Sequence, residues 1–316
     1  MAYHEKNILF SCSWRIILLN LKKFMALENN DFKILSVTES LMKRHEFIPL
    51  EEIIEFSEIR RDEVEFRIKN LSKDRFFSKP VKKILRYEGY QLTSYGLDAL
   101  GLKALVKSGV IDAIGKQLGV GKESDIFEAI NSKGTRLAVK FHRLGRTSFR
   151  QTLRKRGFIA EQSQFSWLNQ SKLSAEKEYS ALKTLVSARV STPKAVKCNR
   201  HIVVMSLIVG TELKFAEMED PKSIAKEILR NVRLAYLKAK LIHSDLSEYN
   251  ILIKPNGQIL IIDWPQSVSI DHPNANDNLK RDIYNIKTCF RRQSNLTIDL
   301  DNALEYVKGN IRKLTI

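Results

Sequence analysis

The hydrophobic pattern of the first third of the chain predicts three helices followed by a β-ribbon. Apolar residues recur at helical spacing after Asp31 and again after Leu50. The third helix is expected to bury one face, formed by Val64, Ile68 and Leu71. Two β-like runs follow, at 76–77 and 84–92. This order predicts a winged helix, whose third helix commonly enters a nucleic-acid groove; the alternative is that the module docks on protein or on the next domain.

Beyond Gly109 the pattern changes to short apolar strands and longer helices, so the chain is expected to be α+β. A connecting helix is predicted over 94–108. Strands are then predicted at 126–130, 137–141 and 202–205, and helices at 172–187, 224–240 and 277–292. No internal repeat or low-complexity tract interrupts this order.

The stretch IHSDLSEYNILI, residues 242–253, places three polar side chains inside an apolar run. Residues 251–253 and 259–262 read as strands joined by Pro255-Asn256-Gly257, a strong hairpin signal. Asp245 and Asn250 precede the first strand, and Asp263 follows the second. The three side chains are therefore expected at the ends of one hairpin, where a cation could collect them; the alternative is a turn without metal.

A second candidate site begins at the glycine-containing segment GVGKESDIFEA. Gly119 and Gly121 would let backbone approach a phosphate, but Ser124 stands where a third glycine is usual, and Lys122 lacks the Ser or Thr of a Walker A loop. Downstream, Lys140 lies within an apolar strand, where a solvated lysine is out of place. The helix that follows offers a partner in Glu178, together with a core face of Tyr179, Leu182 and Val186.

Charge is distributed unevenly along the 316 residues, which carry a net charge of +17. Residues 26–100 hold 13 basic and 14 acidic residues, whereas residues 142–200 hold 13 basic and 3 acidic ones. The surplus predicts a polyanion partner or a charged flexible loop; a solvated lysine-rich surface is the alternative. The three cysteines are far apart, which favours a reducing compartment and a cytoplasmic protein.

The glycine loop, strand lysine, helix glutamate, His-x-Asp-x4-Asn and strand-terminal Asp occur in the order found in protein kinases. In detail the sequence resembles the RIO family of atypical serine/threonine kinases, in its winged-helix-bearing second subfamily. The similar motifs are VGKESDI, NRHIVVM, HSDLSEYN, IDWPQ and HPNA. Only 53 residues follow Asp263, and Ser244 replaces the arginine that usually reads activation-loop phosphorylation.

This resemblance implies a minimal two-lobed kinase domain after the winged helix. We expect an N-terminal extension over 1–24 and a winged-helix domain with its connecting helix over 25–108. The N-lobe is then expected over 109–209, with a basic flexible loop at 142–171, and the C-lobe over 210–316.

The resemblance also implies roles for the candidate residues, with ATP and Mg²⁺ as cofactors. Asn250 and Asp263 offer hard oxygen ligands for Mg²⁺, Asp245 orients or deprotonates the attacking group, and His243 braces its loop. Lys140 would hold the α- and β-phosphates and be fixed by Glu178. The remaining nucleotide contacts are assigned to the glycine loop and to the hinge: Gly119, Gly121, Lys122, Ser124, Met205 beside the adenine, and the hinge residues Ser206 to Ile208.

The function that the resemblance implies is ATP-dependent maturation of the small ribosomal subunit, with the subunit precursor and its rRNA as partners and a possible protein substrate. An aspartyl-phosphate intermediate is expected from the same source. The basic segment would carry an autophosphorylation site at Thr147, Ser148 or Thr152, or would contact rRNA phosphates. Two alternatives remain open: an aminoglycoside-type phosphotransferase and a non-catalytic rRNA-binding assembly factor.

Overall fold

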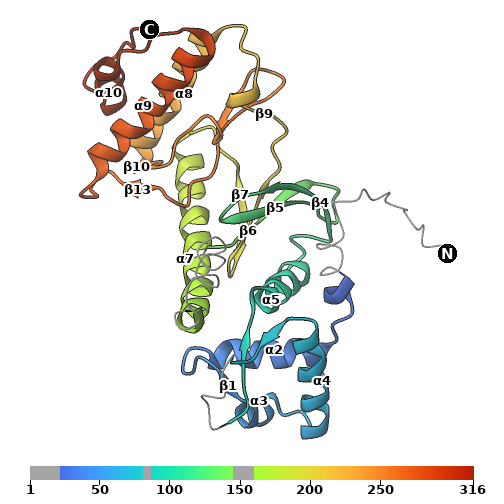
Figure 1. The fold of residues 1–316 in the computed structure, drawn as a ribbon. Coiled ribbons are helices and arrows are strands. Elements are labelled where there is room, and N and C mark those ends of the chain that lie inside the picture. The colour runs from blue at the N-terminus through green and yellow to red at the C-terminus, as the bar shows by residue number, and fades with distance from the viewer. Residues whose placement is uncertain (1–21, 81–86, 145–159) are drawn as a thin grey trace, which may run out of the picture. The chain divides into compact units, whose positions relative to one another are not determined.

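The computed structural model describes residues 22–80, 87–144 and 160–316 (Figure 1). In the last of these ranges the side chains are described from residue 167 onward. The chain divides into two compact units between Ala104 and Leu105, inside helix α5 (Ser94–Lys107). Each unit is built around its own secondary structure.

The N-terminal unit is a winged helix, as predicted. Its elements are α2 (Asn29–Leu41), β1 (Ile48–Pro49), α3 (Leu50–Ser57), α4 (Arg61–Lys73), β2 (Phe77–Ser78), β3 (Gly89–Leu92) and the first part of α5. The strands form an antiparallel sheet in the order β1-β3-β2, of which β1 was not expected from the sequence. The predicted apolar face of α4 is buried, and it consists of Val64, Ile68 and Leu71.

The two arginines of α4 are paired with carboxylates of the same unit, whereas Lys69 and Lys73 are exposed. Arg67 contacts three carboxylates, those of Glu28, Asp31 and Glu63, at 2.8, 3.1 and 2.8 Å. Arg61 is paired with Glu51 and Glu65. Arg67 thereby links α4 to α2, and the exposed Arg61 links α4 to α3.

The second unit begins with a five-stranded antiparallel sheet in the order β4-β5-β6-β8-β7. Its strands are β4 (Ala113–Val120), β5 (Ser124–Ile130), β6 (Arg136–His142), β7 (Ala195–Asn199) and β8 (Ile202–Ser206). Helix α7 (Ala160–Ser187) packs against β6, β7 and β8, as the long yellow-green helix in Figure 1 shows. β4 and β7 were not predicted, because most of their residues are exposed or only half-buried and give no strong alternation.

Helix α7 corrects two expectations. The basic loop predicted over 142–171 is too long, since β6 includes residue 142 and α7 begins at Ala160; residues 160–187 contain no Gly or Pro to stop a helix. The predicted core residue Val186 is exposed, while Leu185 is fully buried. With 3.6 residues per turn, Leu182 and Leu185 lie on the same helix face as Glu178, whereas Val186 lies outside this face.

The rest of the second unit is mostly helical. Its elements are β9 (Thr211–Glu212), a 3₁₀ helix at Leu213–Phe215, α8 (Pro221–Leu234), a π-helix at Ala235–Ala239, β10 (Leu241–Ile242), β11 (Ile251–Ile253), β12 (Ile259–Ile261), β13 (Val268–Ser269), α9 (Ala275–Ser294) and α10 (Leu300–Lys308). The predicted hairpin is β11–β12, with Ile251 opposite Ile261. Gly257 in its turn has a φ of +78°, a conformation that glycine adopts without strain.

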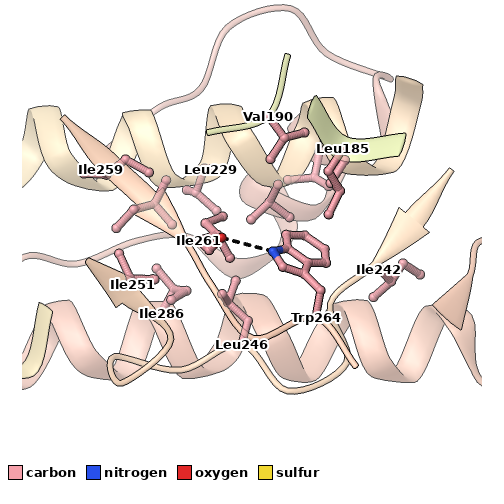
Figure 2. Close-up of a cluster of buried hydrophobic side chains, with 14 of the residues drawn as sticks. Leu185, Val190, Leu229, Ile242, Leu246, Ile251, Ile259, Ile261, Trp264 and Ile286 are labelled. Carbon is pink, nitrogen blue, oxygen red and sulfur yellow. Dashed lines mark hydrogen bonds between the residues drawn. The ribbon is translucent and has the colours of Figure 1, made fainter. Parts of the chain in front are cut away.

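A continuous apolar core joins the helices, the hairpin and α7 within this unit (Figure 2). Trp264, 1% exposed, lies at its centre and donates a hydrogen bond from Nε1 to the carbonyl oxygen of Ile261 at 3.0 Å. The indole therefore fixes the chain immediately after Asp263. Within the described ranges, no helix combines the length and apolar character needed to cross a bilayer.

Candidate active site

Lys140 is buried at the middle of β6, with Ile126 of β5 on one side and Val203 of β8 on the other. Its side chain is 4% exposed, and its ammonium contacts two carboxylates: Nζ lies 2.7 Å from Glu178 Oε1 and 2.6 Å from Asp263 Oδ1. A buried lysine is stable as a cation only when such partners offset the loss of water. Burial by itself would lower the pKa of Lys140, and the two carboxylates raise it above its ordinary value.

Asp263 is held in an unusual backbone conformation at the end of the hairpin. Its φ is +67°, which is uncommon for a residue with a side chain. The carbonyl of Ile262 lies 2.9 Å from His243 Nε2, and the rings of His243 and Trp264 lie 4.5 Å apart. The packed imidazole and indole thus hold the turn that directs Asp263 toward Lys140. His243 braces this loop, as predicted.

The loop before β11 brings Asp245 and Asn250 together. Asn250 Nδ2 donates a hydrogen bond to the backbone carbonyl of Asp245 at 2.8 Å, and the carbonyl of Asn250 accepts from the Ile262 amide at 2.9 Å. The amide group of Asn250 is therefore oriented by its nitrogen, which leaves its oxygen available to a cation. Asp245 is accessible to solvent, but partial burial of its carboxyl group raises its pKa, and the nearby charge of Asp263 adds to the rise.

Sequence reasoning missed a buried carboxylate that supports this loop from α9. Asp282 is 1% exposed and accepts hydrogen bonds from the backbone amides of Ser244 at 2.8 Å and Leu246 at 3.0 Å. Ser244 has a φ of +68°, so these bonds stabilise a strained residue next to Asp245. The signal was present in the sequence: Asp282 shares an apolar helical stripe with Leu279, Ile283 and Ile286.

The glycine segment forms the turn between β4 and β5. Gly119 is paired with Ile126, which is paired in turn with Lys140, so two strand spacings, about 10 Å, separate Gly119 from Lys140. The amide of Gly121 donates to the carbonyl of Ser124 at 2.8 Å and closes the turn, while Lys122 is exposed at its tip. A Cβ placed on Gly119 would meet no atom within 4 Å, so this face of the turn is open.

The predicted hinge follows β8. Met205 is 8% exposed and belongs to the apolar core, and Ile208 is half-buried. The hydroxyl of Ser206 accepts a hydrogen bond from the backbone amide of Lys194 at 2.9 Å. It therefore binds the segment just before β7. The Ser206 amide also donates to the Lys194 carbonyl at 2.9 Å, so what remains for a nucleotide at this position is the backbone of residues 207–208.

The described residues bring together Lys140, Glu178 and Asp263 by direct contact, and Asp245 and Asn250 by a second contact. They contain no group of three or more His, Cys, Asp or Glu arranged to hold a metal ion. Mg²⁺ does not require such a cluster, because it retains waters and is usually bound by one or two protein oxygens plus phosphate. The hard oxygens of Asp263 and Asn250 fit that pattern.

Several predicted residues lie outside the described part of the chain. These are the autophosphorylation candidates Thr147, Ser148 and Thr152, together with the arginines and lysines of residues 146–156. Their roles stay predictions.

A buried strand lysine paired with a helix glutamate, an Asp–Asn loop and a strand-terminal Asp define a protein-kinase-like phosphotransferase. Two family models match the chain: the RIO domain over residues 125–303 and the Rio2 N-terminal domain over residues 24–108. The chain therefore belongs to the RIO family of serine/threonine-protein kinases, and within that family to the Rio2 group.

The similar proteins agree with this assignment. The RIO-type serine/threonine-protein kinase Rio2 of Methanocaldococcus jannaschii is 39% identical over 276 residues, which cover 84% of this chain and 99% of that protein. The kinase RIO2 of Caenorhabditis elegans is 36% identical and is covered over only 52% of its length. The structure of Rio2 kinase from Chaetomium thermophilum, an ADP/Mg²⁺-phosphoaspartate complex, superposes with a TM-score of 0.78 at 31% identity, covering 91% of this chain and 89% of that one.

Proposed function

We propose that this chain binds ATP with Mg²⁺ between the β4–β5 turn and the loop of Asp245, and transfers or hydrolyses its γ-phosphate. The observation that carries the proposal is the buried ammonium of Lys140, held between Glu178 and Asp263. Phosphate oxygens of ATP would replace Asp263 as one partner of Lys140, which frees the Asp263 carboxylate for the metal. Mg²⁺, when bound, neutralises charge that develops on the phosphate oxygens.

Titration calorimetry with ATP and with ADP, each with and without Mg²⁺, tests this proposal. Binding that requires the metal, together with release of inorganic phosphate from ATP, is the expected result. A chain that binds neither nucleotide would contradict it. Support for the ligand pair also comes from the Chaetomium thermophilum Rio2 kinase, which holds ADP and Mg²⁺.

We also propose that Asp263 accepts the γ-phosphoryl group during turnover. An oxygen of its carboxylate attacks the γ-phosphorus, a new O–P bond forms, and the bond to the β–γ bridging oxygen breaks so that ADP leaves. Water then attacks the phosphorus of the acyl-phosphate, Asp245 accepts the water's proton, and the O–P bond to Asp263 breaks to release phosphate. The raised pKa of Asp245 makes it a better proton acceptor than an ordinary aspartate.

The cellular partner that we propose is the precursor of the small ribosomal subunit, contacted through its rRNA. The proposal rests on the family resemblance and on the surplus of 13 basic over 3 acidic residues in 142–200. Co-sedimentation with small-subunit precursors, with and without ATP, tests it. Replacing Arg150, Arg154, Lys155 and Arg156 by Ala should reduce the magnitude of the log–log salt slope by roughly 0.7–0.9 for each lost phosphate contact; an unchanged slope would assign this charge another role.

A further inference from the structure

Glu178 is held by two side chains of β6, of which the proposed function uses only one. Lys140 and His142 are two positions apart on the strand, so both side chains leave the same face of the sheet, toward α7. Lys140 Nζ lies 2.7 Å from Glu178 Oε1, and His142 Nε2 lies 2.8 Å from Glu178 Oε2. Each carboxylate oxygen thus has its own nitrogen neighbour.

The contact between His142 and Glu178 is buried and has no substitute nearby. His142 is 3% exposed and Glu178 is 1% exposed. The nitrogen and oxygen are at ion-pair distance, although they are not aligned as a regular hydrogen bond, and neither atom has another hydrogen-bond partner among the described residues. Buried polar atoms almost always have a partner, and His142 Nε2 is the nitrogen that the described residues place at ion-pair distance from Glu178 Oε2.

The other imidazole nitrogen fixes which atom faces Glu178. His142 Nδ1 lies 3.1 Å from Ser174 Oγ, and Ser174 is one helical turn before Glu178 on α7. A serine hydroxyl can donate to Nδ1, which leaves the single proton of a neutral imidazole on Nε2, facing a carboxylate that can only accept. In this tautomer Nδ1 accepts from Ser174 and the Nε2 proton lies on the side of Glu178, so the two contacts link two successive turns of α7 to β6.

We propose that His142, supported by Ser174, is a positioning residue for the nucleotide site. His142 contacts Oε2 of Glu178, which fixes the orientation of the carboxylate. Oε1 then stays at Lys140, and the ammonium keeps its position for a phosphate oxygen. The inference rests on the proposed function, because it takes Lys140 as a phosphate ligand. Burial by itself would raise the pKa of Glu178, whereas the charge of Lys140, with the imidazole contact of His142, lowers it to about 2.

The test is a double-mutant cycle on Mg-ATP affinity, measured by calorimetry. His142→Leu removes the contact to Glu178 and should weaken binding by about tenfold, while His142→Gln, which keeps an N–H donor, should recover most of the affinity. In a Glu178→Gln background, His142→Leu should add less than about a twofold loss, because its effect passes through the carboxylate. Val139→Ala, a buried change on the opposite face of β6, controls for general loosening of the sheet and should leave affinity within about twofold.

Equal losses from His142→Leu in both backgrounds, or an equal loss from Val139→Ala at matched stability, would overturn the inference while leaving the proposed function intact. Failure of the unmodified chain to bind Mg-ATP would instead overturn the proposed function and this inference with it. If His142→Leu does not fold, Ser174→Ala replaces it in the same cycle: an affinity loss of about two- to fivefold that disappears with Glu178→Gln supports the proposal, and an unchanged affinity overturns it.

Discussion

Lys140 and Asp263 are 123 positions apart in the sequence, and their side chains meet at 2.6 Å. The contact joins the five-stranded sheet to the end of the β11–β12 hairpin, so it connects the two halves of the site through one ammonium. Because Glu178 holds the same ammonium from α7, the position of Lys140 is fixed from two sides. Under the proposed function, a phosphate oxygen of ATP then replaces Asp263 Oδ1 as a partner of Lys140 Nζ.

The first prediction concerns this lysine. Lys140→Ala should weaken Mg-ATP binding by about tenfold or more, since a buried charge opposite the phosphates is lost. Lys140→Arg should recover only part of the affinity, because a planar guanidinium cannot replace a compact ammonium between two carboxylates. Lys133→Ala, in the exposed turn between β5 and β6, is the matched control. Full affinity in Lys140→Ala would remove this residue from the site.

The second prediction concerns the support of the Asp245 loop by α9. Asp282→Asn keeps the size of the side chain but leaves one of the two backbone amides, of Ser244 or Leu246, without an acceptor. Unfolding in urea should show a loss of about 1–3 kcal/mol, and ATPase kcat should fall by about tenfold while KM for ATP changes little. Asp277→Asn, exposed in the first turn of the same helix, removes only a favourable charge at the helix N-terminus and should cost no more than about 1 kcal/mol, with kcat unchanged. A normal kcat in Asp282→Asn would show that the loop holds its shape without this carboxylate.

Much of this arrangement could be predicted from local sequence. Lys140 stood out because one charged residue interrupted an apolar strand, and the hairpin was marked by Pro255-Asn256-Gly257. The order of these features then indicated the family and its fold. These predictions therefore depend on short-range sequence patterns, and the folded chain shows the strand lysine and the hairpin where those patterns place them.

Residues whose importance depends on tertiary contacts were harder to find. Asp282 and His142 both bind groups on another element, and neither has a local partner that a spacing rule would reveal. The edge strands β4 and β7 expose much of their length, so no apolar alternation marked them. In the third helix of the winged helix, the arginines are visible in the sequence, but two of the carboxylates that pair with Arg67, at residues 28 and 31, are distant in sequence and are identified only by the fold.

The third prediction is a pH dependence of stability. Glu178 has a pKa of about 2 in the folded chain, below its ordinary value of 4.5. A lowered pKa means that the carboxylate stabilises the fold fully above about pH 4.5 and that this contribution is lost as the pH falls toward 2. Urea midpoints of Glu178→Gln should therefore lie furthest below those of the unmodified chain near neutral pH, and the gap should narrow below pH 4.5. Glu176→Gln, exposed on the same helix, should show no such gap. A gap that is constant with pH would rule out this linkage.

The fourth prediction tests Asp263 as the phosphoryl acceptor. Incubation with γ-labelled ATP and Mg²⁺ should label the protein in a form that hydroxylamine releases, because acyl-phosphates react with this nucleophile and phosphoserine and phosphothreonine do not. Asp263→Asn should abolish that fraction. Asp245→Asn should instead increase it, since the proposed proton acceptor for hydrolysis is lost while the acceptor of the phosphoryl group remains. Asp271→Asn, an exposed change in the segment that follows, is the control and should label normally. Label that resists hydroxylamine, together with undiminished ATPase activity in Asp263→Asn, would show that the carboxylate is not phosphorylated. Lys140 would then remain as the phosphate ligand, and the 2.6 Å contact with Asp263 would serve only to hold that lysine in place before ATP arrives.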